Sequence, residues 1–163
     1  MSASETPYRV LFVCTGNTCR SPMAAGALQA ALGSEAGRVD VASAGTAARE
    51  DEPATPEAIA VTAGDGVDLR GHRSRRLTPE VLRAADLVIV MERAHARTVQ
   101  SLGADPKRTH VLSEWPQPGR PDFEVSDPYG GSREAYEECW RRIQAHVERL
   151  TPHVLEAIRA RSC

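Results

Sequence analysis

A short stretch near the start of the chain places a thiol and a guanidinium on either side of a small polar loop. Cys14 and Arg20 are separated by five residues, 15–19. A cysteine thiolate is a strong nucleophile, and arginine can form two parallel hydrogen bonds with a phosphate-like group. The spacing therefore predicts covalent phosphoryl transfer. Cys14 would be the nucleophile, and Arg20 would bind the phosphate oxygens and stabilise charge in the transition state.

The elements on either side of this loop should hold it in place. The apolar residues at 10–13 predict a buried strand from about Arg9 to Val13, and a helix is expected to follow and end near Leu32. Ser21 is predicted to be the N-cap of that helix and Pro22 its first helical residue, because serine and proline favour those two positions. A loop that connects a strand to a helix N-terminus presents unpaired backbone N–H groups, which bind anions.

That loop is therefore expected to form a phosphate-binding cradle. Asn17 should adopt a left-handed backbone conformation there, which asparagine tolerates. Surrounded by donors and beside Arg20, Cys14 should have a lowered pKa. No metal or other cofactor is expected, because backbone amides and Arg20 supply the positive field. The predicted phosphate-binding residues are Thr15, Gly16, Asn17, Thr18, Cys19 and Arg20.

Further along the chain, strand and helix patterns alternate. Strands are predicted near 39–43, 87–91 and 109–112, and the continuous apolar run at 87–91 is typical of a central parallel strand. The expected fold is α/β: a single-domain, doubly wound sheet of about four parallel strands with helices on both faces. Residues 1–7 should form a flexible tail and residues 8–163 the domain.

Several helix boundaries are also predicted. Thr55 and Thr78, each followed by proline, should begin helices, and Ser132 should cap a long amphipathic helix. Pro152 should either kink that long helix or start a second segment.

Composition excludes several classes of protein. The chain has 163 residues and a formal charge of −2, without the basic excess of a general nucleic-acid binder. No apolar run approaches the ~20 residues that a membrane helix needs, and the first residues do not form a signal peptide. Cys14, Cys19, Cys139 and Cys163 fit neither a zinc site nor a disulfide framework. We expect a cytoplasmic monomer.

The motif Cys14-Thr-Gly-Asn-Thr-Cys-Arg-Ser-Pro resembles the low molecular weight protein tyrosine phosphatase family, and the resemblance covers nearly the whole chain. It includes the segment 43–46, the segment 66–72, the strand at 86–91 and Asp127-Pro128-Tyr129. Within that family, the loop motif and the Asp-Pro-aromatic-Gly-Gly-Ser sequence are similar to the bacterial protein arginine phosphatases. The resemblance implies phosphorylated proteins as substrates and a cysteinyl-phosphate intermediate on Cys14.

The resemblance also assigns roles to more distant residues. Asp127 would be the general acid that protonates the leaving group; from its position before a proline alone, it could equally be a turn-former. The Ser21 hydroxyl would stabilise the Cys14 thiolate. Ser43 and His72 would support the loop, although a histidine in a basic stretch could also be a surface residue.

Cys19 has two possible roles. In the family, a cysteine at this position can trap oxidised Cys14 as a reversible disulfide. The alternative is that Cys19 only packs within the loop.

Thr18 and Tyr129 are the residues predicted to determine which phosphorylated amino acid the enzyme accepts. Tyrosine-directed family members commonly carry a bulkier aliphatic residue at position 18, whereas the Thr18 hydroxyl suits the polar N–P group of phosphoarginine. The loop at 47–54 is acidic and lacks an aromatic residue, and Gly130 follows Tyr129 where tyrosine phosphatases often place a second aromatic. These features favour phosphoarginine, with phosphotyrosine as the alternative.

Two other classes of function are compatible with a phosphate cradle. Related folds act as arsenate reductases, but no cysteine lies between Cys19 and Cys139 to relay oxidation. A catalytically inactive phosphopeptide-binding module is the second alternative, and the joint presence of Cys14, Arg20 and Asp127 argues against it.

Overall fold

The computed structural model describes residues 6–116 and 124–161. Four strands, all parallel, form one sheet in the order β2-β1-β3-β4, which confirms the predicted α/β sheet. Most of the predicted 1–7 tail and Cys163 lie outside the described residues. The strands are β1 (Tyr8–Cys14), β2 (Val39–Gly45), β3 (Leu87–Val90) and β4 (Thr109–Val111).

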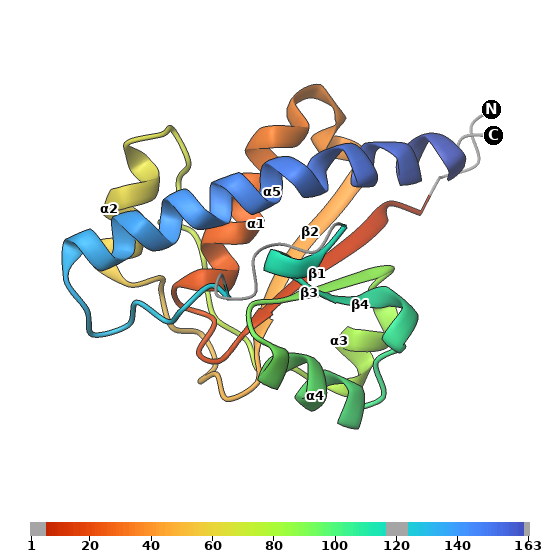
Figure 1. Ribbon diagram of the computed structural model, residues 1–163, viewed down its shortest axis with the longest axis horizontal. Coiled ribbons are helices and arrows are strands. Elements are labelled where there is room, and N and C mark those ends of the chain that lie inside the picture. The colour runs from red at the N-terminus through yellow and green to blue at the C-terminus, as the bar shows by residue number, and fades with distance from the viewer. Residues whose placement is uncertain (1–5, 117–123, 162–163) are drawn as a thin grey trace.

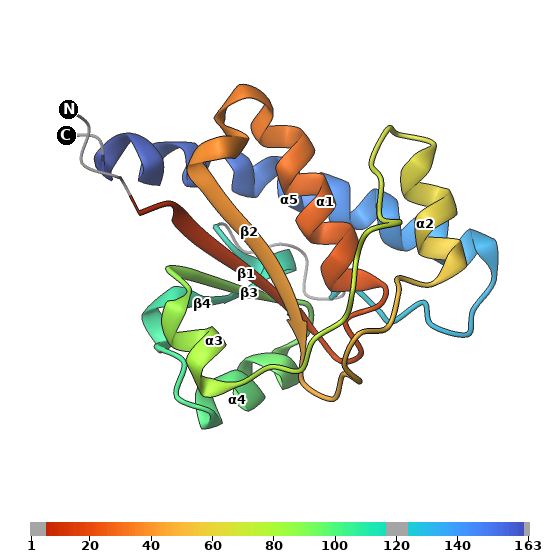
Figure 2. The ribbon, with the colours of Figure 1, turned by 180° about the vertical axis from the view of Figure 1, so that it is seen from behind.

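Helices cover both faces of the sheet, as Figures 1 and 2 show from opposite sides. One face carries α1 (Arg20–Leu32) and α5 (Arg133–Arg161), with α2 (Pro56–Ala63) beside α5. The other face carries α3 (Pro79–Ala84) and α4 (Arg93–Ser101). Short 3₁₀ helices occupy Gly33–Arg38, Pro106–Arg108 and Leu112–Glu114.

The alternation of side chains along β1 divides the core into two layers. Val10, Phe12 and Cys14 point to the core beneath α1 and α5, whereas Leu11 and Val13 point to the core on the α3–α4 side. Each fully buried large apolar side chain contributes about 1.5–3 kcal/mol. This packing fixes the strand that ends at Cys14 and sets the face toward which the cysteine points.

The order of the strands creates a site at one edge of the sheet. The chain passes from β1 outward to β2 and later returns to β3 on the other side of β1. In open parallel sheets, ligands bind at the carboxyl ends of the strands where the order reverses in this way. The loop after β1 and the residues after β3 therefore lie next to each other.

The starts of α2 and α3 agree with the sequence predictions, whereas the start of α1 does not. Thr55 and Thr78 cap their helices by accepting from backbone N–H groups three residues on. Helix α1 begins at Arg20 without a side-chain cap. The predictions that Ser21 is the N-cap and Pro22 the first helical residue are therefore wrong. The Ser21 hydroxyl lies within the first turn and contacts a sulfur atom instead.

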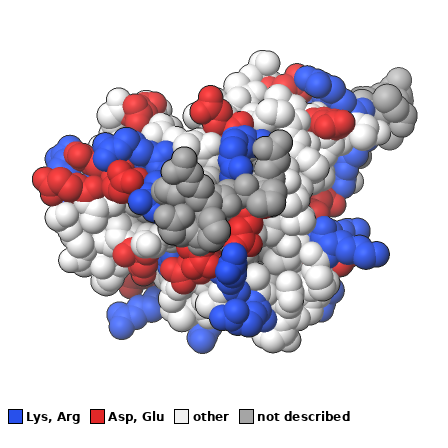
Figure 3. Space-filling view, viewed as in Figure 1, with Lys and Arg blue, Asp and Glu red and all other residues white. Residues whose placement is uncertain are grey.

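Helix α5 is continuous across Pro152, so the predicted alternative of a second, separate segment is wrong. Pro152 has no backbone N–H and cannot form the helical hydrogen bond at its position. Leu150 and Val154, on either side of the proline, are fully buried, and their packing stabilises the helix there. Basic and acidic side chains alternate along α5 on the face shown in Figure 3, and pairs such as Arg133–Glu137 join them.

Candidate active site

The loop between β1 and α1 wraps around the sulfur of Cys14. The backbone N–H of Asn17 donates to Cys14 Sγ at 3.3 Å, and Ser21 Oγ lies 2.9 Å from the same sulfur. Asn17 has a φ of 57°, which confirms the predicted left-handed conformation. This conformation turns the amide of Asn17 inward, so the loop surrounds the thiol with donors.

The side chain of Asn17, fully buried, holds the loop to its surroundings. Its Nδ2 donates to Ser21 Oγ at 2.8 Å and to Ser43 Oγ at 2.9 Å, and its Oδ1 accepts from the backbone N–H of Arg75 at 2.9 Å. His72 Nε2 lies 2.7 Å from the Asn17 carbonyl oxygen. The structure thus brings Ser43 and His72 to the loop, as the resemblance implied. Burial lowers the pKa of His72, and it is not a free surface histidine.

The end of β2 packs directly against the loop. The backbone N–H groups of Thr46 and Ala47 donate to the carbonyls of Cys14 and Thr15, both at 2.9 Å. A Cβ atom at Gly45 would lie 2.5 Å from the Thr15 carbonyl oxygen. Only glycine permits this close contact, so Gly45 allows the end of β2 to pack directly against the loop.

Arg20 is 2% exposed and is held by groups from three segments. Its Nη1 donates to Glu92 Oε1 at 2.7 Å and to the Val125 carbonyl at 2.9 Å. Its Nη2 lies 3.7 Å from Asp127 Oδ2 and 3.5 Å from Thr15 Oγ1. Sequence reasoning missed Glu92. Its position two residues after β3, at the carboxyl end of a central strand, was the signal that could have found it.

Asp127 and Tyr129 reach the pocket from a segment far along the chain. Asp127 Oδ1 accepts from the backbone N–H of Tyr129 at 3.0 Å, and the Asp127 side chain is 48% exposed. Tyr129 is 70% exposed. Both residues face the pocket, so the structure places the predicted acid beside Arg20.

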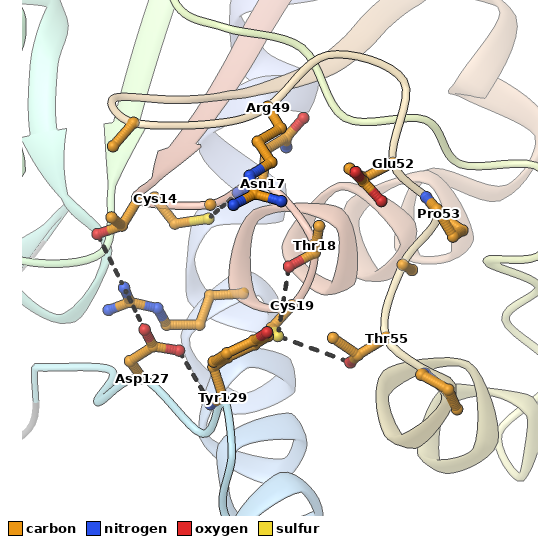
Figure 4. A pocket seen from close by; sticks show the side chains of 16 residues that line it. Cys14, Asn17, Thr18, Cys19, Arg49, Glu52, Pro53, Thr55, Asp127 and Tyr129 are labelled. Carbon is orange, nitrogen blue, oxygen red and sulfur yellow. Dashed lines mark hydrogen bonds and ion pairs between the residues drawn. The ribbon is translucent and has the colours of Figure 1, made fainter.

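Together these segments enclose a pocket of about 520 Å³. Figure 4 shows Asp127 and Tyr129 on one side of Cys14, with Arg49, Glu52 and Pro53 on the other. The pocket is lined by all seven residues from Cys14 to Arg20, by Ala47, Arg49, Glu52, Pro53, Ala54, Thr55 and Pro56, and by Asp127 and Tyr129.

The prediction of a lowered pKa for Cys14 is wrong. Burial of the thiol raises its pKa above the ordinary value and outweighs the opposing groups. Hydrogen bonds with Ser21 and Asn17 and the charge of Arg20 all lower the pKa, but by less. The sequence identified the groups that stabilise the thiolate and missed how deeply the sulfur is buried beneath them.

Cys19 points away from the pocket floor toward α5. Its Sγ lies 3.4 Å from Tyr136 Oη and 3.6 Å from Thr55 Oγ1, and the backbone N–H of Thr55 donates to the Thr18 carbonyl at 3.0 Å. Cys14, Cys19 and Cys139 are all free thiols. The contact between Cys19 and Tyr136 was not predicted from the sequence.

Among residues 6–116 and 124–161, no cluster of three or more histidine, cysteine or acidic side chains is arranged to hold a metal ion. Within the same residues, every helix is too short or too polar to cross a bilayer.

A family model described as "Low molecular weight phosphotyrosine protein phosphatase" matches residues 9–161. The chain belongs to this family. It is similar to a "Probable low molecular weight protein-tyrosine-phosphatase EpsP" of Ralstonia nicotianae, with 38% identity over 89% of this chain and 94% of the relative. It is also similar to a "Protein-arginine-phosphatase" of Bacillus subtilis, with 37% identity over 86% of this chain and 93% of the relative.

Solved structures agree with this assignment. The fold of this low molecular weight phosphatase matches the "YwlE arginine phosphatase from Geobacillus stearothermophilus" with a TM-score of 0.81. The identity is 34%, over 93% of this chain and 95% of that one. The chain is therefore a phosphoprotein phosphatase, as the sequence resemblance implied. The names of its relatives include both tyrosine and arginine phosphatases.

Proposed function

We propose that this low molecular weight phosphatase hydrolyses phosphoarginine in proteins through a cysteinyl-phosphate on Cys14. One observation supports the proposal above all: Cys14, Arg20 and Asp127 line a single pocket, with the sulfur at its floor and the carboxylate at its mouth. A nucleophile, a cation for the phosphoryl oxygens and an acid for the leaving group are the three groups that this reaction needs.

The first step transfers the phosphoryl group to the enzyme. Cys14 reacts as the thiolate, the form that its contacts with Ser21 and Asn17 and the charge of Arg20 favour against the effect of burial. The thiolate attacks phosphorus, the P–N bond breaks, and the protonated Asp127 carboxyl gives its proton to the departing nitrogen. In the second step Asp127, now a carboxylate, takes a proton from water as that water attacks phosphorus. The S–P bond breaks, inorganic phosphate is released, and the thiolate is restored.

Polar groups around the mouth support phosphoarginine as the substrate. Thr18 contributes a hydroxyl to the wall, and the carboxylates of Glu52 and Asp127 face the pocket from opposite sides. After the phosphoryl group is bound, a guanidine still has N–H groups to donate, and carboxylates are suitable acceptors. A phenol ring offers no such donors.

Tyr129 favours a second candidate substrate, phosphotyrosine. Its ring is 70% exposed at the pocket mouth, where it could stack against a phenyl group. A guanidinium plane can stack on the same ring, so Tyr129 alone does not decide between the two substrates.

A comparison of rates on two peptides tests the proposal. The peptides would share one sequence and carry either phosphoarginine or phosphotyrosine at the same position. We expect kcat/KM to be larger for phosphoarginine, and a larger value for phosphotyrosine would overturn the assignment of substrate. Absence of turnover on both peptides and on a generic aryl phosphate, under reducing conditions, would instead favour a binding module. Arsenate-dependent oxidation of thioredoxin would favour an arsenate reductase.

We also propose that the protein is a monomer in the cytoplasm. There, Cys19 would protect Cys14 by forming a disulfide with it when the enzyme is oxidised. Cys19 would have to leave its contacts with Tyr136 and Thr55 to reach Cys14. Treatment with peroxide followed by thiol reductant should restore activity to the wild type and much less to Cys19→Ser. Equal recovery in both would contradict this role.

A further inference from the structure

The hydroxyl of Thr15 has a set of contacts that the reaction steps above do not use. Thr15 is exposed and lines the pocket next to Cys14. Its Oγ1 lies 2.9 Å from His95 Nε2 and 3.5 Å from Arg20 Nη2. The arginine nitrogen can only donate, so the role of the histidine nitrogen determines how the hydroxyl is oriented.

His95 belongs to the first turn of α4 and is 4% exposed. Its Nδ1 accepts from the backbone N–H of Glu92 at 3.1 Å as part of a capping box. A neutral imidazole that accepts at Nδ1 carries its proton on Nε2. His95 therefore donates through Nε2 to Thr15 Oγ1.

Two influences keep His95 in this neutral form. Burial lowers its pKa, and the nearby charge of Arg20 on α1 lowers it further. The carboxylates of Glu92, Asp127 and Glu124 act in the opposite direction but more weakly. The donor at Nε2 is present in both the neutral and the protonated ring, whereas the acceptor at Nδ1 exists only in the neutral ring.

The Thr15 hydroxyl thus receives two donors, and these occupy its two lone pairs. Its own hydrogen is then directed away from His95 and Arg20, and the residue faces the pocket. We propose that the Thr15 hydroxyl donates a hydrogen bond to the bound phosphoryl group, and that His95 is the positioning residue that orients it. This inference rests on the proposed function, because it requires a phosphoryl group above Cys14.

The same turn of α4 also holds the catalytic arginine. Glu92 binds Arg20 through its side chain, and His95 binds Thr15, while the capping box ties Glu92 and His95 to each other. The residues that follow β3 therefore orient both the Arg20 guanidinium and the Thr15 hydroxyl, the two side-chain groups that would contact the phosphoryl oxygens.

Variants at Thr15 test the inference by phosphate binding. Thr15→Val keeps the shape and removes the hydroxyl, whereas Thr15→Ser keeps the hydroxyl. We expect Thr15→Val to weaken binding of inorganic phosphate, measured by calorimetry, by about 10-fold to 100-fold, the usual effect of losing a hydrogen bond to a charged group. Thr15→Ser should change it by less than about threefold. Thr98→Val, which removes an exposed hydroxyl from α4, is the matched control and should have no effect.

Variants at His95 separate positioning from stability. In His95→Asn the amide oxygen replaces Nδ1 and keeps the helix cap, but the donor to Thr15 is lost. In His95→Gln the amide nitrogen can replace Nε2 and restore that donor. We expect His95→Asn to weaken phosphate binding and lower kcat on para-nitrophenyl phosphate, with His95→Gln recovering most of both. Thermal unfolding of each variant reports any loss of stability.

A double-mutant cycle gives the deciding outcome. In the Thr15→Val background, His95→Asn should have almost no further effect on phosphate affinity, because its target is already absent. Unchanged phosphate affinity in Thr15→Val, or an equal effect of His95→Asn in both backgrounds, would overturn the inference. Failure of the proposed function is distinguishable, because it would appear as a wild-type protein without turnover.

Discussion

The base of the pocket and its rim are built in opposite ways. At the base, Asn17, Arg20 and Ser21 are almost fully buried. Asn17 and Arg20 have hydrogen-bond partners from separate segments, and Ser21 contacts Cys14 and Asn17 within the loop. At the rim, Asp127 is half exposed and Tyr129 is largely exposed. Arg49 and Glu52 on the opposite side are exposed as well.

This difference separates two tasks. Buried polar groups must be satisfied, and a satisfied network holds its members in one geometry, which suits a charged transition state. An exposed rim has room to accommodate different leaving groups. We therefore expect changes at the base to affect every substrate alike, and changes at the rim to affect substrates unequally. The following predictions test this division, from the largest expected effect to the smallest.

Cys14→Ser should reduce turnover of every substrate by about 10⁴-fold or more, because a serine hydroxyl is a far weaker nucleophile at neutral pH. Inorganic phosphate should still bind, since the backbone donors and Arg20 remain. Steady-state rates and calorimetry would measure the two effects. Cys139→Ala, a buried cysteine on α5, is the control and should retain activity. Retained turnover in Cys14→Ser would remove the nucleophile from the proposal.

Asp127→Ala should slow release of basic leaving groups by about 10²-fold to 10⁴-fold, the usual contribution of a general acid. Leaving groups that depart without protonation should lose much less. The measurement is kcat/KM across a series of aryl phosphates whose phenols differ in pKa, together with phosphoarginine. An equal loss for all of them would contradict the acid role and would mean that Asp127 affects every substrate alike, as residues at the base of the pocket do.

Ser21→Ala should raise the pKa of Cys14 still further above its ordinary value. Burial already raises that pKa, and the Ser21 hydrogen bond lowers it, so loss of the hydroxyl removes a contribution that favours the thiolate. We expect the pH profile of iodoacetamide alkylation to move up by about one pH unit, which lowers the rate about tenfold at a fixed pH below the pKa.

Ser43→Ala provides the matched control for this shift. Ser43 accepts from Asn17 Nδ2, as Ser21 does, but Ser21 alone of the two also contacts the sulfur. Removal of the Ser43 hydroxyl should move the pH profile of Cys14 alkylation much less than removal of the Ser21 hydroxyl does. A profile that stays in place in Ser21→Ala would show that the hydroxyl does not act on the sulfur.

Thr18→Ile should shift preference from phosphoarginine toward phosphotyrosine by about tenfold. It replaces a wall hydroxyl by an apolar group, and polar recognition of a leaving group is more sensitive to such a change than apolar contact. The ratio of kcat/KM on the two matched peptides measures this effect. Turnover of para-nitrophenyl phosphate by the same variant shows whether the substitution has damaged the base of the pocket. An unchanged ratio would mean that Thr18 does not set the preference between the two substrates.

Local sequence patterns predicted most of the secondary structure because they depend on neighbouring residues alone. The apolar run ending at Met91 formed β3 in the centre of the sheet, and Thr55 and Thr78 capped their helices. The cap predicted at Ser21 failed because the Cys14 sulfur and the Asn17 side chain, both in the preceding loop, bind the same hydroxyl. A propensity is a preference between local alternatives, and another partner for the same side chain overrides it.

The chemistry of the site was determined by the sequence: a thiol and a guanidinium in one small loop, with Asn17 positioned to turn the backbone. Only the tertiary structure decided which groups hold that chemistry in place. Glu92, His95 and Tyr136 come from elements far along the chain, and no pattern near the loop indicates them. The pKa of Cys14 also depended on the fold, because burial is a property of everything packed around the sulfur and not of its neighbours in sequence.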